Sequence, residues 1–156
     1  MEQIEQSDPV VNKILQEIEA ASSSRTSPKT KLLIARLLQS YHPITISVTG
    51  DKKQFEVDRT INSNATIESV ESIDFAFIGE GQNEATMHQR ASSLIDKMHS
   101  NSLVILHGIH TDSNMEAAWN QLKQHANISL TIDLFDIGLL FCRKEQKEKE
   151  HFIILY

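Results

Sequence analysis

Two histidines near the middle of the chain have residue types and a spacing that could do chemistry. His107 and His110 follow the apolar run SLVIL at 102–106, and Glu80 or Asp112 could supply a third ligand. Two imidazoles and a carboxylate suit zinc or iron. However, a strand-to-loop segment does not hold two side chains on one face as a helix does. We therefore expect polar loop residues and no metal, with a site of His107, His110 and Asp112 as the alternative.

The usual nucleophilic side chains lack the surroundings that would activate them. No serine lies in a G-x-S-x-G elbow. Cys142 stands in an apolar strand pattern, where a thiol is typically buried and inert. A single cysteine also rules out an internal disulfide and fits a reducing compartment. We expect no catalytic residue.

Composition and charge narrow the possible partners. The chain has 156 residues, a formal net charge of -6 and 40% hydrophobic residues. This length and composition fit one soluble domain over 1–156. Nucleic-acid binding would require a basic patch, and no such patch is visible. No apolar run approaches the length of a membrane span, and the segment MEQIEQSDPVV is not a secretory signal. We expect a cytoplasmic protein with no membrane or nucleic-acid partner.

Helical periodicity occupies the amino-terminal part of the chain. Apolar residues at helical spacing predict helices over 10–21 and 28–41. Ser27 and Pro28 suit the cap and first turn of the second helix, and Pro43 ends it. Its apolar stripe is expected to contain Leu32, Leu33, Ala35, Leu37 and Leu38. We expect this helical segment, 1–41, to pack on the rest of the domain.

Strands and helices then alternate. ITISVTG reads as a strand ending at Gly50, followed by a DKK turn and a second strand in QFEVDRTI. Further along, we expect strands at 73–79, 102–106, 128–135, 137–143 and 151–156, and helices at 83–101 and 113–125. The last helix presents one apolar face to the core: Met115, Ala118, Trp119 and Leu122. This order predicts an α/β fold with a mostly parallel sheet and a C-terminal antiparallel hairpin.

Several segments resemble bacterial class I S-adenosylmethionine-dependent methyltransferases. SNMEAAWNQLKQH and SLTIDLFDIGLLFCRKEQKEKEHF match the last helix and final hairpin of that family. DFAFIGEG stands where the family has a strand ending in Asp-Gly, and SLVILHGI where it has a strand ending in paired Asp. SPKTKLLIARLLQSYHP is similar to the helix before the first strand. The resemblance covers 27–49 and 73–156 and implies a Rossmann-like fold.

The chain departs from that family where the cofactor would bind. The family's first strand leads into a glycine-rich loop, whereas ITISVTGDKK offers only Gly50. Only 22 residues lie between Gly50 and Ile73, too few for two strand–helix units, since one crossover takes about ten or more. Asp58 follows Gly50 too closely to replace the family's ribose-binding acid. The sequence predicts a truncated fold that lacks part of its cofactor-binding half.

The family's acidic strand ends are also replaced. Its Asp-Gly aspartate corresponds to Gly79, beside Glu80, and its paired Asp correspond to His107 and Gly108. Such carboxylates hold a hard cation, which glycine and imidazole do not. We expect no cofactor-binding residue and ordinary turn geometry for the glycines. The alternative is a residual crevice lined by Gly50, Gly79, Glu80, His107 and Gly108.

We therefore expect a non-catalytic methyltransferase-like protein, without cofactor, that acts as a binding or assembly module. One alternative is a methyltransferase whose S-adenosylmethionine site is unusual or completed by a partner. Another is a small histidine-based metal-binding protein. Lost strands leave an open sheet edge, so we expect a homodimer or another protein partner to cover residues 44–61 or the amino-terminal helices. Phe55, Val57 and Ile61 would then be partly exposed in the monomer.

Overall fold

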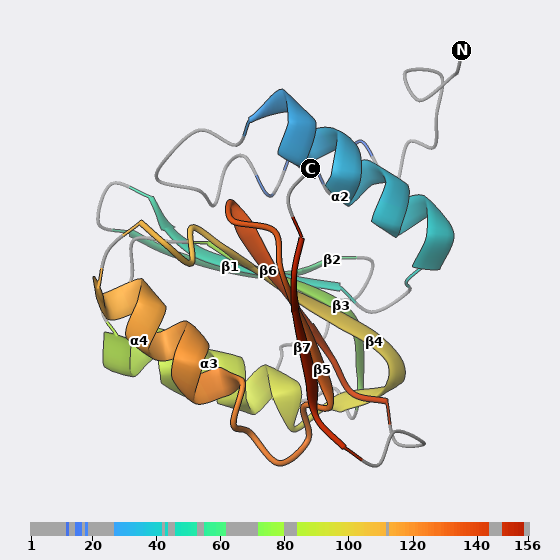
Figure 1. Cartoon of the computed structure of the whole chain (residues 1–156). Helices are drawn as coiled ribbons and strands as arrows, with labels where there is room; N and C mark the ends of the chain where they lie inside the picture. The colour runs from blue at the N-terminus through green and yellow to red at the C-terminus, as the bar shows by residue number, and fades with distance from the viewer. Residues whose placement is uncertain are drawn as a thin grey trace.

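A mixed β-sheet lies between two layers of helices in this computed structural model (Figure 1). The structure describes residues 12, 15–16, 18, 27–41, 43, 46–52, 55–61, 72–79, 84–111, 113–143 and 148–154. Helix α2 (Pro28–Tyr41) covers one face, and α3 (Glu84–Ile95) and α4 (Ser113–Leu122) cover the other. Of these helices, none combines the length and hydropathy needed to cross a bilayer.

The sheet has seven strands in the order β2-β1-β3-β4-β6-β5-β7. They are β1 (Ile46–Lys52), β2 (Phe55–Ile61), β3 (Ile73–Ile78), β4 (Met98–His107), β5 (Leu130–Asp133), β6 (Ile137–Phe141) and β7 (Glu150–Ile153). The pairings make five strands run in one direction, with β2 and β6 reversed. The α/β class, the mostly parallel sheet and the antiparallel hairpin of β5 and β6 are confirmed.

Strand β1 continues beyond the predicted end at Gly50. It pairs antiparallel with β2 along its whole length, from Ile46 opposite Ile61 to Lys52 opposite Phe55. The predicted hairpin is confirmed, but the predicted strand end is wrong, and so is the start of the turn at Asp51. The physical reason is that the ladder continues through Gly50, which pairs with Val57.

Strand β4 begins earlier than the apolar run predicts. Helix α3 ends at Ile95 and β4 starts at Met98, so the prediction of helix to residue 101 is wrong. Met98 pairs with Ile73, and the register shifts before Phe75 pairs with Leu103. The Ser102 hydroxyl donates to the Ile73 carbonyl at 2.5 Å and supports this irregular stretch. Such a polar start to a strand lacks the alternating pattern that sequence reasoning uses.

Helix α2 has the predicted bounds and packs on the sheet. The Thr30 N–H donates to the Ser27 hydroxyl at 3.2 Å, so Ser27 caps the helix as expected. Ile34, Ala35 and Leu38 are buried against the sheet, whereas Leu32 is 39% exposed, which corrects the predicted stripe. Of the predicted helix 10–21, the described residues 12, 15–16 and 18 are helical, and the rest lies outside the described residues. The helical segment therefore packs on the domain where it is described.

The opposite face of the sheet is built around one aromatic side chain. Met115, Ala118, Trp119 and Leu122 of α4 are all buried, as predicted. The Trp119 ring lies so close to Gly138 on β6 that a Cβ there would be 2.5 Å from a ring carbon. Real Cβ atoms do not approach so closely, and a buried indole has no open space into which to shift. Glycine at 138 is therefore required by space.

This contact predicts that Gly138→Ala destabilises the domain. Overpacking a well-filled core costs about 1–3 kcal/mol, measured as the free energy of unfolding in urea. The matched control is the same substitution in a Trp119→Phe background, because the smaller ring removes the atoms that the methyl would meet. There the added cost of Gly138→Ala should fall by at least about 0.5 kcal/mol. Additive costs in the double variant would show that the two residues do not press on each other.

Candidate functional site at the carboxyl edge of the sheet

Three of the predicted crevice residues lie at one edge of the sheet. The last parallel pairs are Thr49 with Ile78 and Ile78 with Leu106. The next residues along these strands are Gly50, Gly79 and His107, which the register therefore places side by side. Ligands of open α/β sheets bind at this edge, outside the carboxyl ends of the strands. Glu80 and Asp112, which complete the predicted sets, lie outside the described residues.

His107 is part of the sheet and not of a loop. It is the last residue of β4, pairs with Ile137 of β6 and is only 6% exposed. Its ring centroid lies 5.9 Å from that of Phe77 on β3. The interpretation of His107 as a polar loop residue is therefore wrong. The physical reason is that the hairpin strand β6 continues the ladder to the end of β4.

Gly108 begins the turn that leads from β4 toward α4. Its φ of 74° lies in the left-handed region, which glycine adopts without strain. Its N–H donates to the Asp136 carbonyl at 2.8 Å, and its own carbonyl accepts from the Thr111 hydroxyl at 2.7 Å. Turn geometry thus accounts for the backbone conformation of Gly108, and the turn carries His110.

His110 lies between two carboxylates. Its Nδ1 is 2.9 Å from Oε2 of Glu116, in the first turn of α4, and its Nε2 is 2.8 Å from Oδ2 of Asp133, at the end of β5. Asp133 is 5% exposed. When the ring is protonated, both nitrogens donate to a carboxylate, so the imidazolium joins the β4–α4 turn, α4 and β5.

Phe135 closes this arrangement from the solvent side. Its N–H donates to Oδ1 of Asp133 at 2.8 Å, and its ring stacks on His110 with centroids 5.3 Å apart. Phe135 has a φ of 72°, which is costly for a residue with a Cβ. Its stacking and hydrogen bond offset that cost. We call the group of His110, Glu116, Asp133 and Phe135 the His110 clamp.

The clamp favours the charged form of the imidazole. The hydrogen bond that the imidazolium donates to Glu116 raises the pKa of His110 above its ordinary value of 6.5. Burial opposes this, and the hydrogen bond to Asp133 and its charge raise the pKa further. A histidine that binds a metal must offer a neutral nitrogen lone pair. Both nitrogens of His110 already face carboxylates, so ligation would break one of these contacts.

The described part of the chain holds no group of three or more His, Cys, Asp and Glu side chains arranged to bind a metal ion. The alternative site of His107, His110 and Asp112 includes a residue outside that part and stays a prediction. Sequence reasoning missed Glu116, Asp133 and Phe135. Glu116 comes from α4, Asp133 from the end of β5 and Phe135 from the β5–β6 turn, so no local motif connects them.

Comparisons with protein families, with curated proteins and with solved structures find no match for this chain. The geometry of the chain itself therefore carries the functional argument. At this edge it offers a carboxylate–imidazole–carboxylate contact that links three elements, carried by the turn that begins at Gly108.

The clamp predicts that protonation of His110 makes the free energy of unfolding depend on pH. Because the folded-state pKa is raised, its contribution is fully present below the ordinary value of 6.5 and is lost as pH rises through the folded-state pKa. We compare wild type with His110→Gln by urea unfolding at about pH 5.5 and about pH 8.5, on either side of that value. The wild-type advantage should be larger at the lower pH.

The difference between the two proteins cancels the titration of groups elsewhere in the chain. Glu116→Gln serves as a matched variant. It removes one of the two carboxylates, so the pH-dependent part of the free energy of unfolding should become smaller without disappearing. A wild-type advantage that is the same at both pH values would show that the folded state does not favour the protonated imidazole.

Proposed function

We propose that this chain is a non-catalytic, methyltransferase-like protein that serves as a binding or assembly module. The observation that carries the proposal is the hairpin of β1 and β2. In sheets of this class, the loop after the first strand leaves the sheet, and its backbone approaches the ligand. Here β1 runs through Gly50 to Lys52 and pairs with the returning β2. The segment that would form a cofactor loop is part of an antiparallel ladder.

The strand order supports the Rossmann-like part of the proposal. The resemblance implies a first strand, two following parallel strands and a closing hairpin. The observed order β1-β3-β4-β6-β5 has these parts, with β6 inserted antiparallel between β4 and β5. On the other side of β1, where further parallel strands would continue the sheet, the neighbour is the antiparallel β2. This is the arrangement expected of a sheet that lacks part of its cofactor-binding half.

The chemistry of the carboxyl edge supports the non-catalytic part. Gly79, His107 and Gly108 stand where the resemblance implies carboxylates for a hard cation. The nearby carboxylates of Glu116 and Asp133 face His110 instead. A methyltransferase with an unusual or partner-completed site is the alternative, and ligand binding distinguishes the two.

The proposal predicts that S-adenosylmethionine and S-adenosylhomocysteine do not bind. Isothermal titration of either compound into micromolar protein should give only the heat of dilution, because the loop and ribose acid are replaced by the β1–β2 ladder. A thermal-unfolding scan with the same compounds is the control, since ligand binding to the folded state raises the unfolding temperature. Saturable heat with one site per chain would favour the methyltransferase alternative.

Assembly requires a surface, and β2 and β7 are the outermost strands of the sheet as the structure describes it. We propose a homodimer that uses residues 44–61, where the resemblance implies lost strands. The side chains of Phe55, Val57 and Ile61 lie outside the described part of the structure. The other edge carries Phe152, Ile153 and Ile154, which are 47%, 69% and 46% exposed. This β7 edge is the competing contact surface, which a matched variant tests.

Light scattering after size exclusion should give twice the chain mass of 17.7 kDa. Phe55→Lys should convert the dimer to monomer, because a charge at a paired edge opposes association. Phe152→Lys is the matched variant on the opposite edge and should leave the dimer intact. If Phe152→Lys gives a monomer and Phe55→Lys does not, the dimer contact lies at β7. A wild-type monomer at all concentrations would contradict the assembly proposal.

A further inference from the structure

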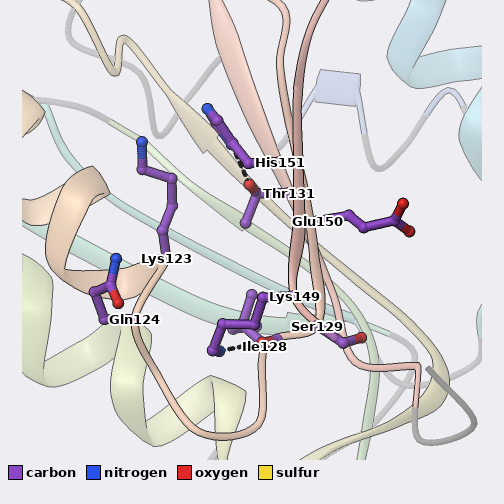
Figure 2. Close-up of a pocket in the computed structure, with 8 residues that line it drawn as sticks. All are labelled: Lys123, Gln124, Ile128, Ser129, Thr131, Lys149, Glu150 and His151. Atoms are coloured by element: carbon purple, nitrogen blue, oxygen red, sulfur yellow. Dashed lines mark hydrogen bonds between the residues drawn. The ribbon is translucent and has the colours of Figure 1, made fainter. Parts of the chain in front are cut away.

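A second site lies at the opposite, amino-terminal end of β5. A cavity of about 220 Å³ is bounded there by the end of α4, the loop before β5, and β7 (Figure 2). Its volume is below the roughly 300–1,000 Å³ of pockets for drug-sized ligands. Lys123, Thr131, Lys149 and His151 contribute polar groups to its lining, and Ile128 contributes an apolar wall. The cavity therefore suits a small ligand with a polar end.

The lining has an excess of positive charge. Lys149 donates from Nζ to the carbonyl of His125 at 2.6 Å and to that of Ile128. The ammonium of Lys123 lies 5.7 Å from the centre of the Trp119 ring. Among the described residues, neither ammonium forms an ion pair with a carboxylate. Carbonyls and a ring face attract a cation but supply no negative charge to balance it.

Lys123 and His151 extend to the same side of the strands, whereas the carboxylate of Glu150 points away from them (Figure 2). Nδ1 of His151 is hydrogen-bonded to the hydroxyl of Thr131, a side chain that is 2% exposed. When that hydroxyl donates, the ring proton resides on Nε2, which is then a donor. The imidazole is thus held in one orientation by a buried partner.

We propose that this cavity binds the oxyanion group of a small molecule, a phosphate or a carboxylate, between Lys123 and His151. Lys149 adds a second positive charge, and Ile128 contacts the apolar part of the ligand. Oxyanions form short, charge-assisted hydrogen bonds with such donors. The local charge is opposite to the formal net charge of -6, so it is not a consequence of overall composition. This inference does not depend on the proposed methyltransferase-like function.

An anion here would change the protonation of His151. In the free protein, burial lowers the pKa of His151, the charge of Lys123 lowers it too, and the charge of Asp133 opposes them. Lys123, directly after α4, and Asp133 of β5 face the ring from the neighbouring elements, and Lys149 and Glu150 precede it along the chain. A bound anion stabilises the imidazolium. Affinity should therefore increase as pH falls toward the free-state pKa.

The test is an NMR titration of the His151 imidazole in the full chain with inorganic phosphate and, separately, with acetate. At least one anion should shift the His151 resonance saturably, more tightly at low than at neutral pH. Lys123→Gln should weaken the affinity by about tenfold, the effect of one charge-assisted bond. Lys123→Arg should retain binding. Lys29→Gln, an equal charge change on α2 across the sheet, should leave the affinity unchanged.

The two anions separate the sources of the oxyanion. Tighter binding of phosphate assigns the site to phosphorylated ligands, and equal or tighter binding of acetate assigns it to carboxylates. The inference is overturned by the absence of a saturable shift with either anion, or by equal affinities of wild type and Lys123→Gln. If Lys123→Gln does not fold, the affinity of the wild-type protein for the two anions, compared at low and neutral pH, still tests the inference.

Discussion

Backbone pairing between β1 and β2 determines what the carboxyl edge of the sheet can hold. On the side of β1 away from β3, a second parallel neighbour would need a crossover of about ten or more residues, whereas an antiparallel neighbour needs only a tight turn. The chain uses the second solution: residues 53–54 separate β1 from β2, and the ladder reaches Lys52 opposite Phe55. The outer hydrogen-bonding groups of β1 are thereby satisfied within the chain. The same pairing uses the residues that a phosphate- or cofactor-binding loop would require.

The rest of the sheet follows from how its two faces are filled. Successive residues of β3 and β4 alternate between the core beneath α2 and the core beneath α3 and α4. Insertion of β6 beside β4 places Gly138 under Trp119, so the position of α4 depends on a residue without a side chain. The His110 clamp then ties α4 and β5 together at the carboxyl edge. At the other end of β5, the end of α4 and the approach to β7 enclose the positively charged cavity.

Local signals predicted much of this architecture. Ser27 and Pro28 marked the start of α2, and the spacing of Met115, Ala118 and Trp119 identified the buried face of α4, since caps and helical periodicity are properties of neighbouring residues. Long-range pairing decided the features that were missed. β1 extends past Gly50 because β2 continues the ladder, and β4 begins in the polar segment at Met98 because it pairs with Ile73.

The candidate site shows the same division between local and long-range information. Sequence reasoning selected His110, but its partners are 6 and 23 residues away, in separate elements. His107 was expected in a loop because its polarity ends the apolar run SLVIL. Its pairing with β6 instead buries it in the sheet. Topology, and not residue type, therefore assigns both histidines their surroundings.

The most direct test of the β1–β2 constraint is a nuclear Overhauser measurement on the backbone of residues 46–61, with and without S-adenosylmethionine. The account predicts cross-strand contacts in antiparallel register, including Gly50 with Val57, that persist unchanged when the compound is added. Absence of these contacts, or their loss on addition of S-adenosylmethionine, would contradict it, because the first strand would then be free to form a cofactor loop.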